Sequence, residues 1–267
     1  MSNRSRIGIL AAILLVSGIT RGGQDTMEAR DIVDRSFKVA KLAGAEMLST
    51  MTIIDGRGRE RIRELASVSK LYDGGATEKR LIRFLAPADV KGTGLLTFDY
   101  ENRDDDMWLF MPALRKTRRI VSTEKAKNFM GSEFTYADMT PPVLEDFTYT
   151  LLGEEEQGGV ACWEIEIAPA SEEVADENGF SKRVVRIGKS DHVLRHALYY
   201  DLDGELHKEL DVLEIQEVDT VQHRFRPVHM VMTNLQNDRR SVLKVDKIAF
   251  SPDVKDEFFT TRYLERY

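Results

Sequence analysis

The sequence is short of several features that mark secreted domains, nucleic-acid-binding proteins and many enzymes. It has one cysteine, Cys162, so no disulfide can form within the chain. An exported protein without disulfides fits a bacterial periplasm better than a eukaryotic secretory route, where small domains are usually cross-linked. The 38 Lys and Arg residues are outnumbered by 45 Asp and Glu residues. The resulting net charge of −7 argues against a nucleic-acid-binding surface.

A long apolar run is also missing after the first residues. Arg4 and Arg6 precede the apolar stretch 7–16, and Ser17 and Gly18 end it. A charged start followed by a short apolar core is typical of a secretory signal peptide, and the stretch is too short to span a bilayer comfortably. We therefore expect a cleaved signal peptide at 1–24 and a single exported domain at 25–267, located in the periplasm. An uncleaved membrane anchor is the alternative.

No catalytic or metal-binding constellation stands out. The triplet Gly131-Ser132-Glu133 lacks the frame of a serine nucleophile elbow, and no phosphate-cradling Gly loop occurs. His192 and His196 have the spacing of a helical zinc pair, but their region has strand character and no third ligand nearby. The run Asp104-Asp105-Asp106 falls where a hairpin turns, so a solvated turn is expected rather than a calcium site. The sequence predicts no enzyme, no metal and no cofactor; an unrecognised hydrolase of an amphiphile is the weaker hypothesis.

What the chain does contain is a long series of alternating segments punctuated by turns. A helix is expected over 27–43, with Ile32, Val33 and Phe37 on one apolar face. The expected strands are 46–54, 59–71, 78–85, 93–100, 106–111, 117–121, 146–154, 160–168, 181–188, 193–201, 205–217, 226–234 and 240–250. Short turns join most of them, so neighbours must pair antiparallel. The fold class is mainly β with a few helices (α+β), built on a sheet of about ten to thirteen strands that must curl or close.

One expected strand, 107–111, is apolar at every position, so both faces of the sheet need cover there. Its side chains alternate between two faces, and we expect the face with Trp108 and Phe110 to line a concave apolar interior. The expected lining of that interior is Phe84, Trp108, Phe110, Trp163, Met230 and Met232. Farther along, the apolar phase of 205–217 slips, which predicts a β-bulge near Val212.

The segment 123–145 has no strand period. It carries Phe129, Met130 and Phe134 and ends at Pro141-Pro142. An apolar, Gly-punctuated segment inserted between strands is typical of a lid over the open end of a barrel, and an ordinary packed connection is the alternative.

Positive charge gathers just before this segment, at Arg115, Lys116, Arg118 and Arg119. In an otherwise acidic chain, such a patch can meet anionic head groups or an acidic partner surface. The alternative is a solvated strand face.

The stretches 84–94 (FLAPADVKGTG), 104–116 (DDDMWLFMPALRK) and 129–139 (FMGSEFTYADM) resemble the outer-membrane lipoprotein-sorting protein family, LolA/LolB-like. The resemblance implies an incomplete antiparallel β-barrel lidded by helices, around an apolar cavity that takes acyl chains. It implies a periplasmic carrier that binds a lipid or lipoprotein acyl chain and moves it between membranes or to and from a transporter. The alternative is a non-carrying accessory that docks onto a membrane transporter. The expected partners are an acyl chain and an inner-membrane lipid-exporting transporter, and a monomer is expected.

Overall fold

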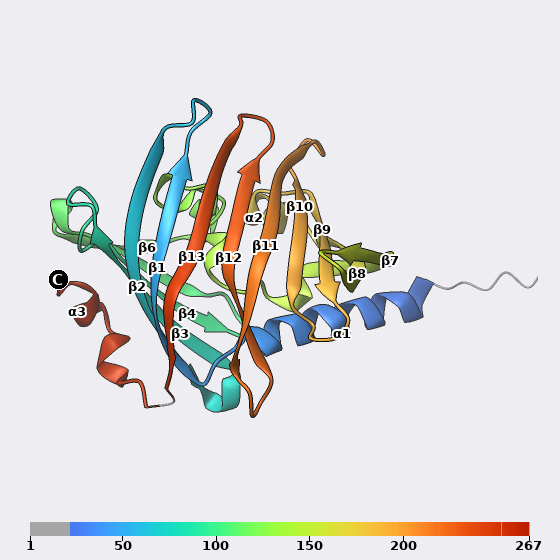
Figure 1. Cartoon of the computed structure of the whole chain (residues 1–267), viewed down its shortest axis with the longest axis horizontal. Helices are drawn as coiled ribbons and strands as arrows, with labels where there is room; N and C mark the ends of the chain where they lie inside the picture. Colours follow the sequence, from blue (N-terminus) through green and yellow to red (C-terminus); the bar gives the residue numbers. More distant parts are fainter. Residues whose placement is uncertain (1–21, 252, 267) are drawn as a thin grey trace, which may run out of the picture.

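The structure is a computed structural model that describes residues 22–251 and 253–266, with side chains from Ala29 onward (Figure 1). Residues 1–21, most of the predicted signal peptide, lie outside the described residues. The described strands are β1 (Gly44–Ile54), β2 (Glu60–Tyr72), β3 (Thr77–Ala86), β4 (Gly94–Tyr100), β5 (Asp106–Met111), β6 (Lys116–Ile120), β7 (Phe147–Gln157), β8 (Val160–Pro169), β9 (Lys182–Gly188), β10 (Leu194–Tyr200), β11 (Leu206–Asp219), β12 (Arg224–Asn234) and β13 (Arg239–Phe250). The helices are α1 (Gly22–Ala40), α2 (Glu172–Asn178) and α3 (Thr261–Leu264).

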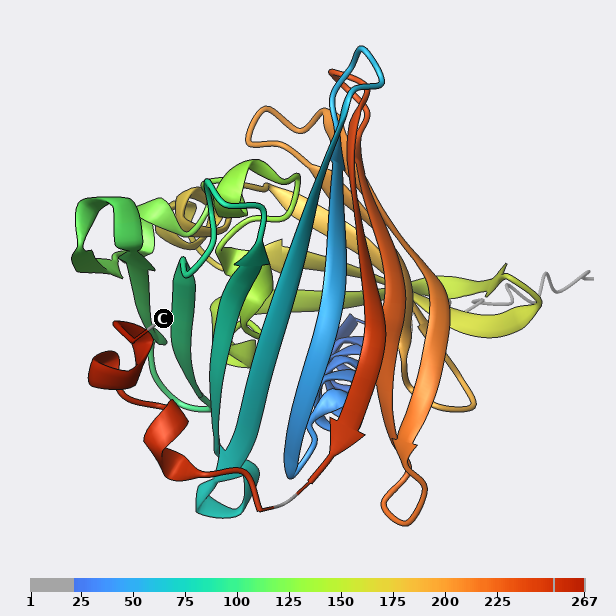
Figure 2. The ribbon, with the colours of Figure 1, turned by 60° about the vertical axis from the view of Figure 1, so that its left-hand side comes forward.

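The described strands form one antiparallel sheet of thirteen, in the order β6-β5-β4-β3-β2-β1-β13-β12-β11-β10-β9-β8-β7. The chain winds outward from β1 to β6, then returns from β7 to β13. The two meanders meet at the β1–β13 ladder, which runs from Ala45 opposite Phe250 to Ile54 opposite Arg240. The sheet bends strongly but leaves β6 and β7 as edges (Figure 2). The predicted α+β class and incomplete antiparallel barrel are therefore confirmed.

This topology explains the segment between β6 and β7. The chain must travel from one sheet edge to the other, so residues 121–146 cross the concave side. We call these residues the crossing segment. It contains four short 3-10 turns, η3 (Ser122–Glu124), η4 (Phe129–Gly131), η5 (Ala137–Met139) and η6 (Leu144–Asp146). Helix α1 lies on the same concave side, visible behind β1 and β13 in Figure 2. Its described side chains Ala29, Ile32 and Val33 are buried.

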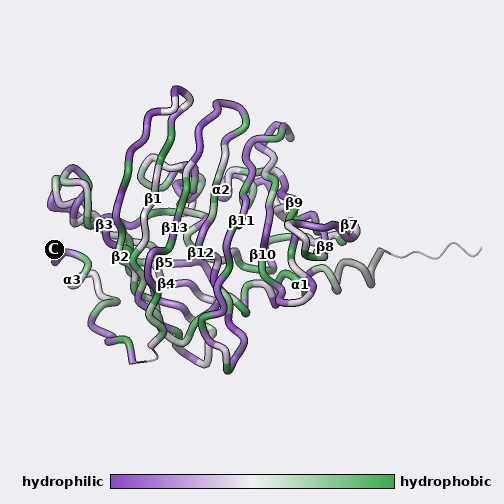
Figure 3. Tube along the Cα trace, viewed as in Figure 1, coloured by the Kyte–Doolittle hydropathy of each residue, from purple (hydrophilic) through white to green (hydrophobic). Residues whose placement is uncertain are grey.

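Two apolar cores lie on opposite faces of the sheet, as the alternation of hydropathy along the strands requires (Figure 3). The inner core joins the concave faces of most strands to α1 and the crossing segment. The outer core is smaller and lies over β2–β5, beneath the C-terminal residues. Its buried members are Leu81, Leu96, Phe110, Val254, Phe259 and Leu264. The strand that is apolar on both faces, β5, is covered on one side by each core.

Several local predictions can be compared with the structure. The bulge predicted near Val212 is present, because Val212 pairs with Met230 while Glu214 pairs with His229. Helix α2 was not predicted, although Ser171 caps it by accepting a hydrogen bond from the Val174 amide at 3.3 Å. Neither α3 nor the packing of the C-terminal residues was predicted. Among the helices of the described residues, none has the length and apolar character needed to cross a membrane.

Candidate functional site

The concave face is an apolar wall covered by aromatic side chains of the crossing segment. Phe84 and Met232 on the wall are 1 % exposed, as is Phe129 above them. The Phe84 and Phe129 rings are 5.7 Å apart, and the Phe129 and Tyr136 rings are 5.6 Å apart. Phe134 belongs to the same core. The crossing segment therefore seals the wall by inserting large apolar groups, not by bridging over an open space.

Helix α1 covers another part of the wall. Ala29, Ile32 and Val33 are at most 5 % exposed, and Phe37 packs against the same core. The helix contacts mainly β7, with further contacts to β12 and β9. Its packing on the wall is apolar, and its ion pair with the crossing segment, from Arg30 to Glu145, is exposed.

Two of the side chains expected inside lie on the other face. Trp108 and Phe110 belong to the outer core, whereas Met107 and Leu109 of the same strand belong to the inner core. Placing Trp108 and Phe110 in the interior was therefore wrong. Side chains of a strand alternate, so Trp108 and Phe110 must face the opposite side of the sheet from Met107 and Leu109. Because both pairs are apolar, the sequence does not indicate which pair faces the concave side. The C-terminal segment covers the face that carries Trp108 and Phe110, and its position was not predicted from the sequence.

The remaining candidate side chains share the inner face. Phe84 and Met232 are buried in the inner core, and Trp163 and Met230 are partly buried against it. The Trp163 ring lies 5.2 Å from the ring of His192. Of the lid residues, Phe129 and Phe134 are buried in this core and Met130 packs against it.

The middle of the crossing segment is clamped to the sheet by polar contacts. Glu133 is only 2 % exposed. Its carboxylate lies 2.8 Å from Arg239 Nε and accepts a hydrogen bond from Asn234 Nδ2 at 3.0 Å. Its backbone N–H donates to Ser241 Oγ at 2.9 Å, and its backbone carbonyl accepts from Lys208 Nζ at 2.9 Å. Burial lowers the pKa of Lys208. We call these five residues the Glu133 clamp.

Two further bonds fix the same turn of the crossing segment. The Arg63 guanidinium donates to the carbonyl of Met130, and Arg239 donates to the carbonyl of Gly131 at 3.1 Å. Met130 and Gly131 both have positive φ, 50° and 78°, so the chain turns sharply here and aims these carbonyls at the sheet.

The acidic run is not the solvated turn that was expected. Asp104 is exposed, but the Asp105 side chain is only 6 % exposed and accepts a hydrogen bond from Thr140 of the crossing segment. Asp106 pairs with Arg119. The expectation failed because a turn next to the crossing segment acquires cover that local sequence does not reveal.

The cationic patch on β6 is partly neutralised. Arg118 pairs with Glu124 at 2.5 Å, and Arg119 pairs with Asp106. Arg115 and Lys116 are exposed, and neither forms an ion pair with the described residues. Two of the four cations are therefore free to meet a partner at this edge of the sheet.

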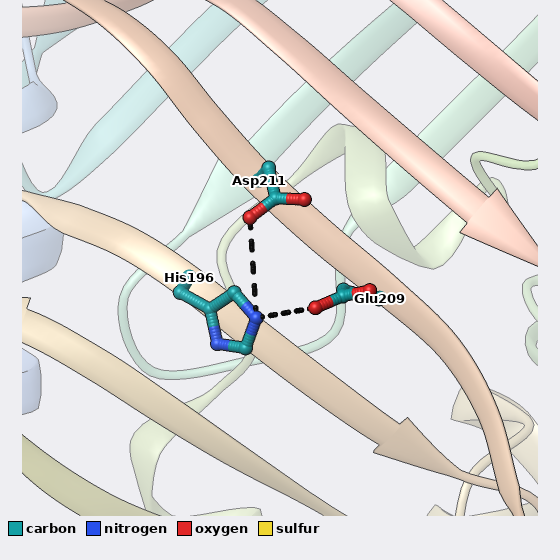
Figure 4. Close-up of side chains that lie close together, drawn as sticks. All are labelled: His196, Glu209 and Asp211. Carbon is teal, nitrogen blue, oxygen red and sulfur yellow. Dashed lines mark hydrogen bonds and ion pairs between the residues drawn. The ribbon is translucent and has the colours of Figure 1, made fainter. Parts of the chain in front are cut away.

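A histidine–carboxylate cluster lies on the convex face, on β10 and β11 (Figure 4). His196 Nε2 is 2.9 Å from Glu209 Oε1 and 4.0 Å from Asp211 Oδ1. One nitrogen and two carboxylate oxygens are a donor set that suits zinc. The carboxylates beside His196 come from the neighbouring strand β11, and His192, considered with His196 in the sequence, is not part of this cluster. The cluster faces away from the inner core, since its strand neighbours Ala197 and Leu210 point into that core.

Comparison with known proteins agrees with this geometry. A protein family described as "Uncharacterized protein" matches residues 76–266. Two solved structures are 26% identical over 90% of this chain and 99% of theirs: an outer membrane lipoprotein-sorting protein domain from Vibrio parahaemolyticus (TM-score 0.81) and a DUF1329 family protein from Desulfovibrio piger (TM-score 0.82). A LolA superfamily protein from Nitrosomonas europaea is 18% identical over 88% of this chain and 98% of its own, with a TM-score of 0.65. No curated protein sequence matches the chain.

With its half-barrel and covered concave wall, the chain has the LolA-like fold. The chain belongs to the family that matches residues 76–266.

Proposed function

We propose that the protein is an exported, periplasmic carrier that binds the acyl chain of a lipid or lipoprotein against its concave wall. The observation that carries this proposal is the wall itself. A broad apolar face of one continuous sheet is covered by a helix and a loop segment, and not by a second sheet. Such covers can be exchanged for an acyl chain, because each buried methylene contributes about 0.8 kcal/mol and so replaces apolar contacts of the same kind.

The two covers differ in how they are held. The crossing segment is tied by the buried Glu133 clamp, and lifting it leaves charged groups without partners, which costs several kcal/mol. Helix α1 packs on the wall through Ile32, Val33 and Phe37. Its hydrogen bonds to β12 lie at its end, where Arg224 and Arg226 donate to the carbonyls of Lys38 and Ala40. An acyl chain can therefore replace the apolar contacts of the part before Lys38 without breaking these bonds. We therefore assign the first opening movement to α1 and keep the crossing segment as a fixed rim.

The relatives support the cargo class. One neighbour is a lipoprotein-sorting domain by name, and it covers 90% of this chain. Loading from an inner-membrane lipid-exporting transporter is part of the proposal, with the free cations Arg115 and Lys116 as the docking point.

Export with cleavage of residues 1–24 is tested by the intact mass of the protein recovered from cells. A full-length, membrane-extracted species would contradict the periplasmic carrier.

The central experiment is lipid binding. Native mass spectrometry of protein purified from periplasm should show a bound lipid, and a dansyl-labelled undecanoic acid should bind at micromolar concentration. Amide exchange should be faster at 29–40 than at 129–136, and the probe should speed exchange in α1 while leaving the clamp protected. Faster exchange at 129–136 than in α1 would return the lid role to the crossing segment.

A non-carrying accessory is the second candidate. The observation in its favour is that the chain's own side chains occupy the wall in this structure. An accessory of this kind would bind a membrane transporter but neither lipid nor the fatty-acid probe. Absence of both kinds of lipid binding, with a folded circular-dichroism spectrum, would decide for it.

A further inference from the structure

The inner face of β3 and β4 changes from charged to apolar along its length. Strands β3 and β4 pair in register, so their inward side chains form three successive cross-strand pairs. These pairs are Glu78 with Asp99, Arg80 with Thr97, and Ile82 with Leu95. Phe84 continues the row on β3 into the inner core. The distance from Glu78 to Phe84 along the strand is roughly 20 Å at about 3.3 Å per residue. One concave surface thus has a charged end and an apolar end.

The charged end is built from several elements. Arg80 donates to Glu78 Oε1 at 2.9 Å and to the carbonyl of Met139 at 3.1 Å. Lys41, just after α1, lies 3.8 Å from Asp99 Oδ2. Arg226 of β12 donates to the carbonyl of Ala40 at 3.0 Å. Glu78 is 4 % exposed and Asp99 is 6 % exposed.

Some of these buried groups have no hydrogen-bond partner among the described residues. They are Arg80 Nε, Asp99 Oδ2 and Asp105 Oδ1. Buried polar groups of native proteins are nearly always paired, so the unpaired donor Arg80 Nε marks a place for an acceptor. The two carboxylate oxygens accept hydrogen bonds and can face an anion only in the protonated form. Arg80 and Asp99 line a gap that is too narrow in this structure for a water molecule, so a ligand enters it only when the cover above it moves. The gap is also lined by Glu78, Thr97, Met139, Thr140 and Pro141. The end of the crossing segment covers this gap through Met139, Thr140 and Pro141.

The charge of this end is positive. Lys41, Arg80 and Arg226 supply three cations. Burial and the nearby Arg80 lower the pKa of Arg226 to about 10, so it stays charged at neutral pH. Burial would raise the pKa of Glu78, but Arg80 and Arg226 together hold it below its ordinary value.

The second carboxyl at this end does not balance the cations. Burial and the charge of Asp105 raise the pKa of Asp99 to about 7, so it carries only part of a negative charge at neutral pH. Asp105 is itself raised in pKa by burial, and Lys125 lies 4.0 Å from it. Partly buried cations in excess attract an oxyanion, which accepts the charge-assisted hydrogen bonds they offer.

We propose that this charged end binds the oxyanion head group, a carboxylate or phosphate, of an amphiphile whose acyl chain lies along the apolar end of β3 and β4. The assignment rests on the proposed carrier function and adds the class of cargo to it. Arg226 and Lys41 contact the head group, and Arg80 is held beside it by Glu78. The acyl chain then runs past Ile82 toward Phe84, under α1 and the crossing segment.

The test compares two probes that differ only in the head group, dansylaminoundecanoic acid and its methyl ester. The wild-type protein should bind the acid at least about tenfold tighter than the ester, a difference of about 1.4 kcal/mol. Arg226→Gln should weaken acid binding about tenfold and leave ester binding unchanged. Arg224→Gln is the matched control, since Arg224 lies on the same strand and donates to the Lys38 carbonyl at 2.8 Å. Dodecyl phosphate should displace the acid probe, and inorganic phosphate at the same concentration should not.

The outcomes separate this inference from the carrier function. Equal affinity for acid and ester, or unchanged discrimination in Arg226→Gln, overturns the head-group site and leaves the carrier standing. Displacement by inorganic phosphate alone shows a free-anion site and also overturns it. Binding of neither probe removes the carrier function itself. If Arg226→Gln fails to fold by circular dichroism, Lys41→Met provides the same comparison.

Discussion

Charged side chains inside an apolar core are expensive, and this protein places several where its covers meet its sheet. Glu133 is the clearest example, because its partners Lys208, Asn234, Arg239 and Ser241 come from β11, β12 and β13. A carboxylate buried this deeply is stable only while its cations and amide donors stay in place. The clamp therefore fixes the register of the crossing segment on the sheet, a role that apolar contacts alone fill poorly.

Removing the carboxylate should destabilise the protein strongly. Glu133→Ala leaves Arg239 and Lys208 with a lost counter-charge, and breaking a buried pair in this way costs about 3–5 kcal/mol. Urea unfolding measures the change. Glu155→Ala, at an exposed position on β7, is the control and should change the free energy of unfolding by less than about 0.5 kcal/mol. Equal effects of the two substitutions would show that the clamp contributes little.

Asp99 should make stability depend on pH. Its pKa is raised by burial from 3.8 to about 7, so the folded protein keeps a proton that the unfolded chain releases above about pH 4. Its contribution to stability is complete below pH 4 and is lost as the pH rises through 7. Asp99→Asn removes the carboxyl, so its advantage over wild type should grow by about 2 kcal/mol between pH 5.5 and 8.5.

Urea unfolding at the two pH values tests this dependence on Asp99. Asp203→Asn, at an exposed turn, should show no such growth. An advantage of Asp99→Asn that is constant with pH would mean that Asp99 is ionised throughout the range.

At the scale of elements, β5 shows where sequence reasoning succeeds and where it stops. The unbroken apolar run predicts a strand covered on both faces, and β5 is such a strand. The same run carries no signal about which face is concave. That depends on the C-terminal residues, which reach the outer face through contacts distant in sequence, such as Arg83 with the carbonyl of Leu264 at 3.0 Å.

In other parts of the fold too, features set by local sequence are predicted and features set by contacts distant in sequence are not. Turns and alternation predict the strands and the bulge near Val212, because these are local. The crossing segment is visible in the sequence as a break in strand period. Its clamp is not visible, because Lys208, Asn234 and Ser241 belong to strands far along the chain. The charged end of β3 is hidden for the same reason, since Arg226 of β12 comes near Glu78 and Arg80 only in the folded sheet.

The two tryptophans provide a direct test of the two faces. Trp163 packs against the inner core and Trp108 against the outer core, and the chain has no others. Each can be studied alone in the variants Trp108→Phe and Trp163→Phe. A brominated fatty acid should quench the fluorescence of Trp163 in the first variant and leave Trp108 unquenched in the second. Quenching of Trp108 alone would place the ligand on the outer face, under the C-terminal residues.

At the scale of the whole molecule, one bent sheet is covered on its inner face by α1 and the crossing segment and on its outer face by the C-terminal residues. The inner covers pack on a broad apolar wall, and α1 is held there by apolar contacts. The outer cover is small and tied by polar bonds to the sheet. Lys70 donates to the carbonyl of Val254 at 2.9 Å and to Asp256 at 2.8 Å, and Arg83 donates to the carbonyl of Tyr263 at 3.1 Å. These bonds tie the outer cover to the sheet, so the proposed carrier function assigns ligand exchange to the concave side.

Truncation after residue 251 should separate these two roles. Loss of Val254, Phe259 and Leu264 uncovers Leu81 and Leu96, which are at most 4 % exposed in the intact protein. An apolar patch uncovered in this way favours self-association and binding of a hydrophobic dye, measured by light scattering after size exclusion and by dye fluorescence. Affinity for the fatty-acid probe should stay within about twofold, because the concave wall keeps all of its side chains.

The single substitution Leu264→Ala is a milder test of the same outer core. It should lower the free energy of unfolding in urea by about 2–4 kcal/mol without loss of probe binding. If truncation abolished probe binding while the protein remained folded and monomeric, the ligand would have to bind on the outer face, and the concave wall would lose its assigned role.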